Sequence, residues 1–288
     1  MRVVRPLYSL ALLAALAAGA RPQPPAGPAD KEALSGNAAK AAEFAAAEAV
    51  RYDVRHADGK GAALKLLPEP VLRWSNPLRA EVYGSVYLWA RDGCPEAASS
   101  IYQFFDRKQL NVELVSLSEV PLRAERNGRL RWSPEAGVTF APLPGGPAPA
   151  DTAAGRQLQM RALARRFTGY LAEPGEADDK LTELRLMAKP LHQYEATDGS
   201  GREGAVFALV TTTDPEIVLL IESRKAKGGG REWVWAAARM HFRPLQLKLG
   251  DKLVWEAPAA APPWEKIRGP EGKYVILQWA SAEEAAKD

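Results

Sequence analysis

The sequence predicts an α+β fold made of two tandem copies, each a helix followed by an antiparallel β-meander. Residues 64–101 recur 120 positions further along the chain, with 8 identities in 38 ungapped positions, where average composition gives about two. Both copies contain short runs of β-branched, aromatic and aliphatic residues, which is the pattern of strands. The turns between these runs are short, and short turns join antiparallel strands.

The repeat is carried by identities that keep their order along the chain. At the offset of 120, the residues that recur are Leu64, Leu66, Pro70, Gly84, Val86, Pro95, Glu96 and Ile101. At an offset of 123, the residues that recur are Pro121, Leu122, Leu130 and Trp132. Upstream, Ala41 and Phe44 match Ala164 and Phe167 at the same offset of 123.

Each copy is expected to begin with a helix. The first, about residues 37–51, is rich in alanine, which has the highest helix propensity. The second begins after Asp151 or Thr152, either of which can act as an N-cap. Residues three and four apart share a helix face, and this spacing predicts an apolar face made of Met160, Leu163, Phe167 and Tyr170.

Strands follow each helix. In the first copy they are expected at residues 63–67, 71–74, 82–90, 97–105, 112–117, 122–125 and 129–132. In the second copy they are expected at residues 181–187, 191–194, 205–211, 217–223, 233–239, 245–249, 252–255 and 274–279. Asp92-Gly93 and Asn127-Gly128 are typical of hairpin turns.

The chain begins with the features of a secretory signal peptide. Arg2 and Arg5 precede an apolar run over residues 7–18, and the small residues at 18–20 predict cleavage after Ala20. We therefore expect residues 1–20 to be a signal peptide and the mature protein to be exported, either periplasmic or secreted. The apolar run is shorter than the roughly 20 residues of a membrane-spanning helix, so no membrane span is expected after cleavage.

Five further segments complete the predicted organisation. Residues 21–37 are rich in proline and glycine and are expected to form a disordered spacer. The first copy covers residues 38–141 and the second covers residues 151–279. A proline-rich linker, residues 142–150, joins them, and a polar tail, residues 280–288, ends the chain.

The charge balance argues against a nucleic-acid partner. Without Arg2 and Arg5, the mature chain has 36 basic and 35 acidic side chains and a net charge of +1. Nucleic-acid binding depends on basic side chains that neutralise phosphates, and neither half has such an excess.

No motif indicates a metal or a cofactor, and we expect neither. The histidines, His56, His192 and His241, lie far apart and lack the spacing of zinc ligands. Cys94 is the only cysteine, so no intrachain disulfide can form. It lacks the signature of a catalytic thiol and is expected in a solvent-facing turn.

Glu96 and Glu216 are the candidate catalytic residues. They occupy equivalent positions in the two copies, each directly after a proline. With two-fold pseudosymmetry between the copies, the two carboxylates would lie near one axis, and paired carboxylates with separated pKa values perform acid–base chemistry. The alternative is structural: the proline fixes a turn, and the glutamate begins the next strand on its solvent side.

Aromatic residues are the candidates for a ligand platform. Tyr87 and Trp89 share one face of a predicted strand, and Trp233 and Trp235 share a face of another. Such rows can stack on sugars or form a protein interface. The alternative is core packing, since tryptophan buries a large area.

Three segments carry a family resemblance: Leu72-Arg73-Trp74-Ser75-Asn76-Pro77, Gly84-Ser85-Val86-Tyr87-Leu88-Trp89 and Thr213-Asp214-Pro215-Glu216. Together they resemble a group of uncharacterised exported proteins of planctomycete-type bacteria, over about residues 38–279. The resemblance implies export and a bacterial origin, and it brings no activity to transfer. The group favours arginine where this chain has Cys94, which argues against an essential role for the thiol.

These observations favour an exported bacterial protein with a non-catalytic binding or scaffold role. Its expected partner is an envelope protein, a glycan or a small ligand, without nucleic acid. The alternative is an extracytoplasmic hydrolase whose site lies between the two copies, with Glu96 and Glu216 as its acid–base pair.

Overall fold

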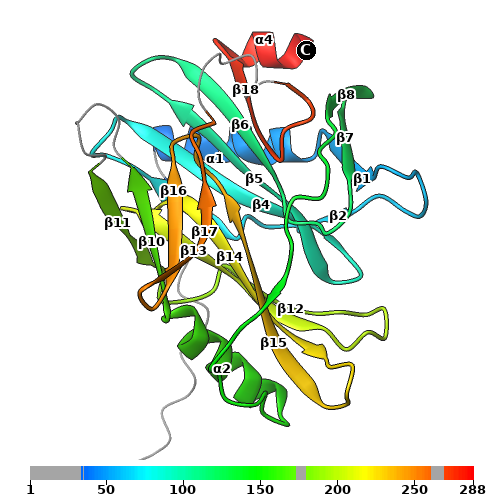
Figure 1. The fold of residues 1–288 in the computed structure, drawn as a ribbon. Helices are drawn as coiled ribbons and strands as arrows, with labels where there is room; N and C mark the ends of the chain where they lie inside the picture. Colours follow the sequence, from blue (N-terminus) through cyan, green and yellow to red (C-terminus); the bar gives the residue numbers. More distant parts are fainter. Residues whose placement is uncertain (1–33, 35, 173–179, 261–268) are drawn as a thin grey trace, which may run out of the picture. The chain divides into compact units, whose positions relative to one another are not determined.

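Two antiparallel β-sheets face each other in this chain, and a helix covers the outer face of each (Figure 1). The computed structural model describes residue 34 and residues 36–172, 180–260 and 269–288. The predicted signal peptide, residues 1–20, and most of the predicted spacer lie outside these residues. The predicted α+β class and the antiparallel pairing are confirmed.

The elements follow one another in a similar order in both halves. Those of the first half are α1 (Gly36–Ala49), β1 (Tyr52–His56), β2 (Lys65–Leu66), β3 (Leu72–Ser75), β4 (Val82–Arg91), β5 (Cys94–Phe104), β6 (Gln109–Ser116), β7 (Leu122–Arg126), β8 (Arg129–Trp132) and β9 (Ala141–Pro142). Those of the second half are α2 (Ala153–Ala164), β10 (Phe167–Ala172), β11 (Leu181–Leu186), β12 (His192–Glu195), β13 (Glu203–Thr211), β14 (Asp214–Lys225), β15 (Arg231–Arg239), β16 (Leu245–Leu249), β17 (Lys252–Ala257), β18 (Tyr274–Trp279) and α4 (Ala282–Lys287).

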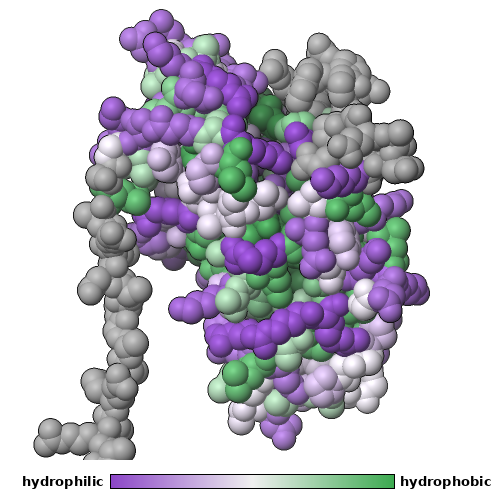
Figure 2. All heavy atoms as spheres, turned by 90° about the vertical axis from the view of Figure 1, so that its left-hand side faces the viewer, coloured by the Kyte–Doolittle hydropathy of each residue, from purple (hydrophilic) through white to green (hydrophobic). Residues whose placement is uncertain are grey.

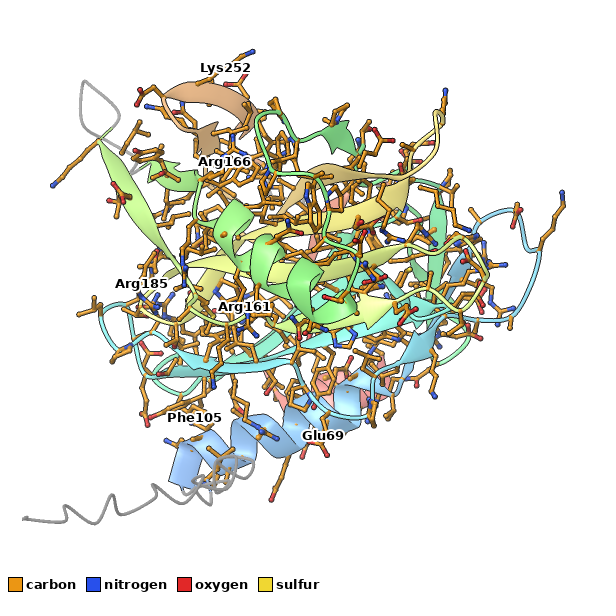
Figure 3. The ribbon with its side chains drawn as sticks, turned by 90° about the horizontal axis from the view of Figure 1, so that it is seen from below. Glu69, Phe105, Arg161, Arg166, Arg185 and Lys252 are labelled. Atoms are coloured by element: carbon orange, nitrogen blue, oxygen red, sulfur yellow. The ribbon has the colours of Figure 1, made fainter. Side chains whose placement is uncertain are left out.

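Hydrophobic packing arranges these elements in four layers. One cluster lies between the sheets, where Val86 and Ala98 of the first sheet share a core with Val218 of the second. α1 packs on the outer face of the first sheet, and α2 packs on the outer face of the second (Figure 3). Because a central strand is covered on both faces, it is apolar along most of its length. In β4, every residue from Gly84 to Ala90 is buried.

An exchange of edge strands links the two halves. β9, at the end of the first half, pairs antiparallel with β15 of the second half. β18, near the end of the chain, pairs antiparallel with β6 of the first half. Each of the two larger sheets is therefore completed by a strand from the other half, while β1, β7 and β8 form a separate three-stranded sheet. Both halves belong to one compact unit, Ser35–Asp288.

Irregularities in the two sheets recur at the offsets found in the sequence. The β4–β5 ladder shifts register between Trp89 and Ala90, and the β13–β14 ladder shifts 120 positions later, between Leu209 and Val210. β8 carries a bulge at Arg131, opposite residues 124–125 of β7, and β17 carries one 123 positions later, at Val254, opposite residues 247–248 of β16. β-Bulges are specific features of a sheet, and these irregularities are separated by the same offsets of 120 and 123 residues.

Glycine is required at one pair of equivalent positions. A Cβ on Gly84 would lie 2.3 Å from the Trp74 ring, and a Cβ on Gly204 would lie 2.3 Å from the Tyr194 ring. In both halves the ring comes from the neighbouring short strand, β3 or β12, directly opposite the glycine. The glycine therefore lets an aromatic ring cross the adjacent strand.

The second helix is shorter than the sequence pattern predicts. Thr152 caps its start by accepting a hydrogen bond from the backbone N–H of Gly155 (3.1 Å), but the helix ends at Ala164. Phe167 and Tyr170 lie in β10 instead, so the predicted match of Phe167 with Phe44, which lies within α1, is wrong. The short strands β1, β9 and β10 were not predicted. The predicted polar tail contains α4.

Candidate functional site

The four predicted platform residues are packed in the core. Tyr87 and Trp89 lie under α1, Trp233 and Trp235 lie under α2, and none is more than 7% exposed. The pairs do share strand faces, as predicted, but those faces are the ones that the helices cover. They therefore form no exposed platform for stacking. The face in Figure 2 mixes hydrophilic residues with smaller apolar areas.

Glu96 and Glu216 lie in different surroundings. Glu96 forms an ion pair with His56, whose Nδ1 in turn contacts the guanidinium of Arg91 at 2.9 Å. The hydroxyl of Ser118 also donates to Glu96, at 3.5 Å. Among the described residues, Glu96 contacts His56 and Ser118, whereas Glu216 lies 3.8 Å from His241, so the two acids share no partner. The expected pairing of these two carboxylates therefore has no support in the structure.

Glu216 instead lies beside a cleft between the two sheets. This cleft has a volume of about 510 Å³ and is lined by both halves, where the β5–β6 hairpin meets the β13–β14 turn. Its walls carry the acids Glu113 and Asp214, the cation Arg79, and several aromatic rings, namely Trp74, Tyr102, Phe104 and Phe242. Ligand sites are typically concave and apolar, with a few converging polar groups.

Glu113 is a buried acid in the middle of β6. The hydroxyls of Tyr102 and Tyr274 donate to its Oε1 at 3.0 and 2.9 Å. Burial raises the pKa of Glu113 to about 8, the charge of Asp214 adds to the rise, and the two tyrosine hydrogen bonds oppose it. At neutral pH this carboxyl therefore holds its proton in most molecules.

Asp214 and Glu216 are alternate residues of β14. Asp214 lines the cleft and accepts a hydrogen bond from the Asn76 amide at 3.2 Å. Burial raises its pKa to about 6, against the Asn76 hydrogen bond and the charge of Arg79. Glu216 is fully buried. Its polar neighbours are the Thr211 hydroxyl and His241 Nδ1, at 3.8 Å, and neither makes a hydrogen bond of normal geometry to its carboxyl oxygens. Burial and the charge of Asp214 raise the pKa of Glu216 well above its usual range.

His241 does not supply the missing positive charge. Its Nδ1 lies 3.8 Å from Glu216, but its Nε2 lies 3.1 Å from the guanidinium of Arg79, and the backbone N–H of Arg243 donates to Nδ1. Burial and the surrounding arginines lower the pKa of His241 well below its usual range. The imidazole is therefore neutral.

The equivalent end of the interface is built differently. There, Glu222 accepts hydrogen bonds from the Tyr194 hydroxyl and from the guanidinium of Arg224, both at 2.6 Å. Arg224 also donates to Glu119 at 2.8 Å, and its guanidinium lies 3.9 Å from the centre of the Phe140 ring. At this end a buried acid is thus paired with an arginine, whereas at the other end Glu113 holds its proton at neutral pH.

Cys94 is buried, contrary to the expected solvent-facing turn. It begins β5, and burial raises the pKa of its thiol to about 11. The thiolate that nucleophilic catalysis requires is therefore scarce at neutral pH. In the described part of the chain, no group of three His, Cys, Asp or Glu side chains is arranged to hold a metal ion.

Comparisons with known proteins identify no relative of this chain. No family model matches it, and neither the curated proteins nor the solved structures give a significant match. Among the helices of the described residues, none is long and apolar enough to cross a membrane.

The sequence pointed to Glu216 but missed its neighbours. Glu113 carried a usable signal, because it alternates with Gln109 and Asn111 along one side of β6, whose other side is apolar. Asp214 was noted only as part of a turn, and His241 was set aside because it has no second histidine nearby in sequence.

Proposed function

We propose that this is an exported bacterial protein that binds a small polar ligand in the cleft between its two halves, without catalysing a reaction. The observation that carries the proposal is Glu216, a fully buried carboxyl without a hydrogen bond of normal geometry, next to Asp214 and His241 in the wall of a cleft of about 510 Å³. An unpaired buried polar group costs stability, on the order of 1–3 kcal/mol. Selection for stability alone would give such a carboxyl hydrogen-bond partners, as Glu222 has at the opposite end of the interface.

Duplication of an ancestral half is the second part of the proposal. It is supported by the recurring register shifts and by the equivalent contacts of Gly84 and Gly204. Reciprocal contacts between the halves also support it: Thr197 N–H donates to the Asp92 carbonyl at 2.8 Å, and Ser75 N–H donates to the Thr213 hydroxyl at 3.0 Å. On this view, duplication gave the interface between the sheets two equivalent ends. Arg224 and its acidic partners fill one end, and the cleft occupies the other.

Export and the relationship to exported planctomycete-type proteins remain proposals that rest on the sequence. Their support is the signal peptide over residues 1–20 and the three segments that resemble that group. Mass spectrometry of the secreted or periplasmic protein would give an N-terminus at Arg21. An N-terminus at Met1 in the cytoplasmic fraction would contradict export.

A hydrolase with its site between the halves is the second candidate. It is favoured by Glu113 and Asp214, two acids of one cleft whose pKa values are about 8 and about 6. Such a pair can supply a proton donor and a base at the same pH. In this version Glu113 and Asp214 take the acid–base roles that the sequence analysis assigned to Glu96 and Glu216. Turnover of chromogenic glycosides or esters that disappears in Glu113→Gln would favour it over simple binding.

Thermal unfolding with a panel of small sugars, amines, amino acids and organic acids tests the binding proposal. A ligand of the folded state raises the unfolding midpoint, by about 3 °C at ten times its Kd. Phe104 lines the cleft, whereas Phe105 lies on the α1 side of the sheet, where its ring contacts Tyr83 (Figure 3). We expect Phe104→Arg to abolish the shift and Phe105→Arg, which adds the same charge elsewhere, to retain it. Failure of every compound to raise the midpoint, or a shift that survives in Phe104→Arg, would refute the proposal.

A further inference from the structure

We infer that the ligand of the cleft is a small neutral sugar, whose hydroxyl groups bind the polar floor of the cleft and whose C–H face packs on its aromatic wall. The inference rests on the proposed binding function and specifies its ligand. Three features carry it: a buried amide without a partner, a row of polar side chains along one strand, and lining charges that come in opposite pairs.

Polar side chains form the floor of the cleft. Gln109, Asn111 and Glu113 alternate along β6, and all three line the cleft. In the sheet, Asn111 lies opposite Gln278 of β18 on one side and opposite Tyr102 of β5 on the other. Both of these residues also line the cleft. The register of three strands therefore assembles the floor from segments that lie far apart in the sequence.

Asn111 has hydrogen-bonding capacity that the protein does not use. The residue is only 2% exposed, and its Oδ1 accepts a hydrogen bond from Gln109 Nε2 at 3.1 Å. Its Nδ2 has no hydrogen-bond partner in the described part of the chain. A buried donor without a partner lowers stability, and an oxygen of a ligand in the cleft would remove that penalty. Amides both donate and accept, as hydroxyl groups do.

The second sheet shows that these polar residues are not needed to form the strand. The residues 123 positions after Asn111 and Glu113 are Val234 and Ala236 of β15, and both are buried. Their partners on β14 likewise lie 120 positions after the partners of Asn111 and Glu113 on β5. Apolar residues thus occupy these ladder positions in the second sheet, whereas the first sheet places an amide and an acid there, beside the cleft.

The charges near the cleft wall come in opposite pairs. Of the two arginines in the wall, Arg107 lies 3.5 Å from Asp106, and the charge of Arg79 acts on Asp214. The acid of the floor holds its proton at neutral pH and adds no charge. Arg239 also acts on that acid, but it lies outside this wall and donates to three backbone carbonyls. An ionic ligand would bring a charge without a partner into this site, and a neutral ligand would not.

The aromatic wall suits the C–H face of a sugar ring. Phe104 and Phe242 line the cleft and are only half-buried. The ring of Tyr102 lies 5.7 Å from that of Phe104 and 5.3 Å from that of Trp74. The face of an aromatic ring is negatively polarised and attracts weakly positive C–H groups. A purely apolar ligand would use this wall but leave the floor amide unpaired, whereas a sugar has surfaces for both.

Titration of the full mature protein with hexoses at pH 7 tests the inference. The probes are glucose, galactose and mannose, with their uronic acids and their 2-amino sugars as anionic and cationic probes of the same ring. We expect at least one neutral hexose to bind in calorimetry, about tenfold more tightly than its two charged analogues. Saturation-transfer NMR should show that the ring C–H protons of the bound sugar lie against the protein.

Two pairs of variants place the sugar in the cleft. Phe104→Ala should weaken binding about tenfold, and Phe105→Ala, on the α1 side of the sheet, should leave it unchanged. Asn111→Leu should also weaken binding about tenfold, while its unfolding midpoint stays equal or rises, because an unpaired buried amide is removed. Gln193→Leu is its control, since Gln193 Nε2 likewise has no partner but Gln193 lies on β12, outside the cleft wall.

The outcomes separate this inference from the binding proposal. If a uronic acid or an amino sugar binds more tightly than its neutral parent, the inference of a neutral ligand is overturned and the binding proposal stands. The same holds if no hexose binds but another compound of the broader panel raises the midpoint of the wild type and not of Phe104→Arg. If a hexose binds Asn111→Leu as tightly as the wild type, the assigned floor is wrong. If no compound raises the midpoint, the binding proposal itself fails.

Discussion

Replacing Glu113 by glutamine should change how the stability of this protein depends on pH. Glutamine preserves the size of the side chain and an oxygen that accepts hydrogen bonds from Tyr102 and Tyr274, but it cannot ionise. In the wild type, burial raises the pKa of Glu113 from 4.5 to about 8. The folded state therefore holds a proton that the unfolded state has already released between these two pH values.

The sign and size of the effect follow from that difference. The stabilising proton is fully present below pH 4.5, and the contribution is lost progressively as the pH rises through 8. Over this window, the linkage relation assigns to Glu113 a loss of about 5 kcal/mol in the free energy of unfolding. The raised pKa values of Asp214 and Glu216 act in the same direction.

Urea unfolding at pH 5 and pH 9 measures the effect. We expect Glu113→Gln to resemble the wild type at pH 5 and to be more stable than the wild type at pH 9, by several kcal/mol. Glu183→Gln, at an exposed position on β11, is the matched control and should follow the wild type at both pH values. Equal loss of stability in the wild type and in Glu113→Gln would show that Glu113 is not held in its protonated form, and the reasoning would fail.

Three further predictions concern the fold. Gly84→Ala should destabilise the protein by about 1–3 kcal/mol in chemical denaturation, because the new Cβ would lie 2.3 Å from the Trp74 ring; wild-type stability would disprove the close packing. Arg126→Ala should lower the free energy of unfolding, measured by chemical denaturation, by about 3–5 kcal/mol, because it leaves the buried Glu48 carboxylate without its partner. Replacing both Arg126 and Glu48 by apolar residues should recover most of that loss. Truncation before β18 should abolish cooperative thermal unfolding followed by circular dichroism, because the first sheet loses an edge strand; a truncated chain that still melts cooperatively at the wild-type midpoint would contradict the strand exchange.

Local patterns were sufficient to predict most of the strands. Short apolar runs bounded by turn residues mark strands, and the paired bulges fall at the offsets of 120 and 123. The boundary between α2 and β10 could not be predicted in this way. Met160 and Leu163 belong to the helix, but Phe167 and Tyr170 continue the same spacing into a strand. The spacing of apolar residues does not show that residues 167–172 pair with β11 and β16 as a strand.

Burial was harder to predict than position. Tyr87 and Trp89 do share a strand face, but only tertiary packing shows that α1 covers it. The candidate site was predicted in part: Glu216 lies next to Asp214 and His241 of the cleft wall, whereas Glu96 contacts His56 and Ser118. The partner acids of Glu216 come from other strands and turns, so no spacing in the sequence connects them.

Carboxyl-carbon NMR of the protein, with Glu113 assigned through Glu113→Gln, tests the central claim most directly. The claim is that the cleft of the proposed binding site buries Glu113 in its protonated form at neutral pH. In the free protein the Glu113 signal should titrate with a midpoint near pH 8. A midpoint near 4.5 would contradict the account.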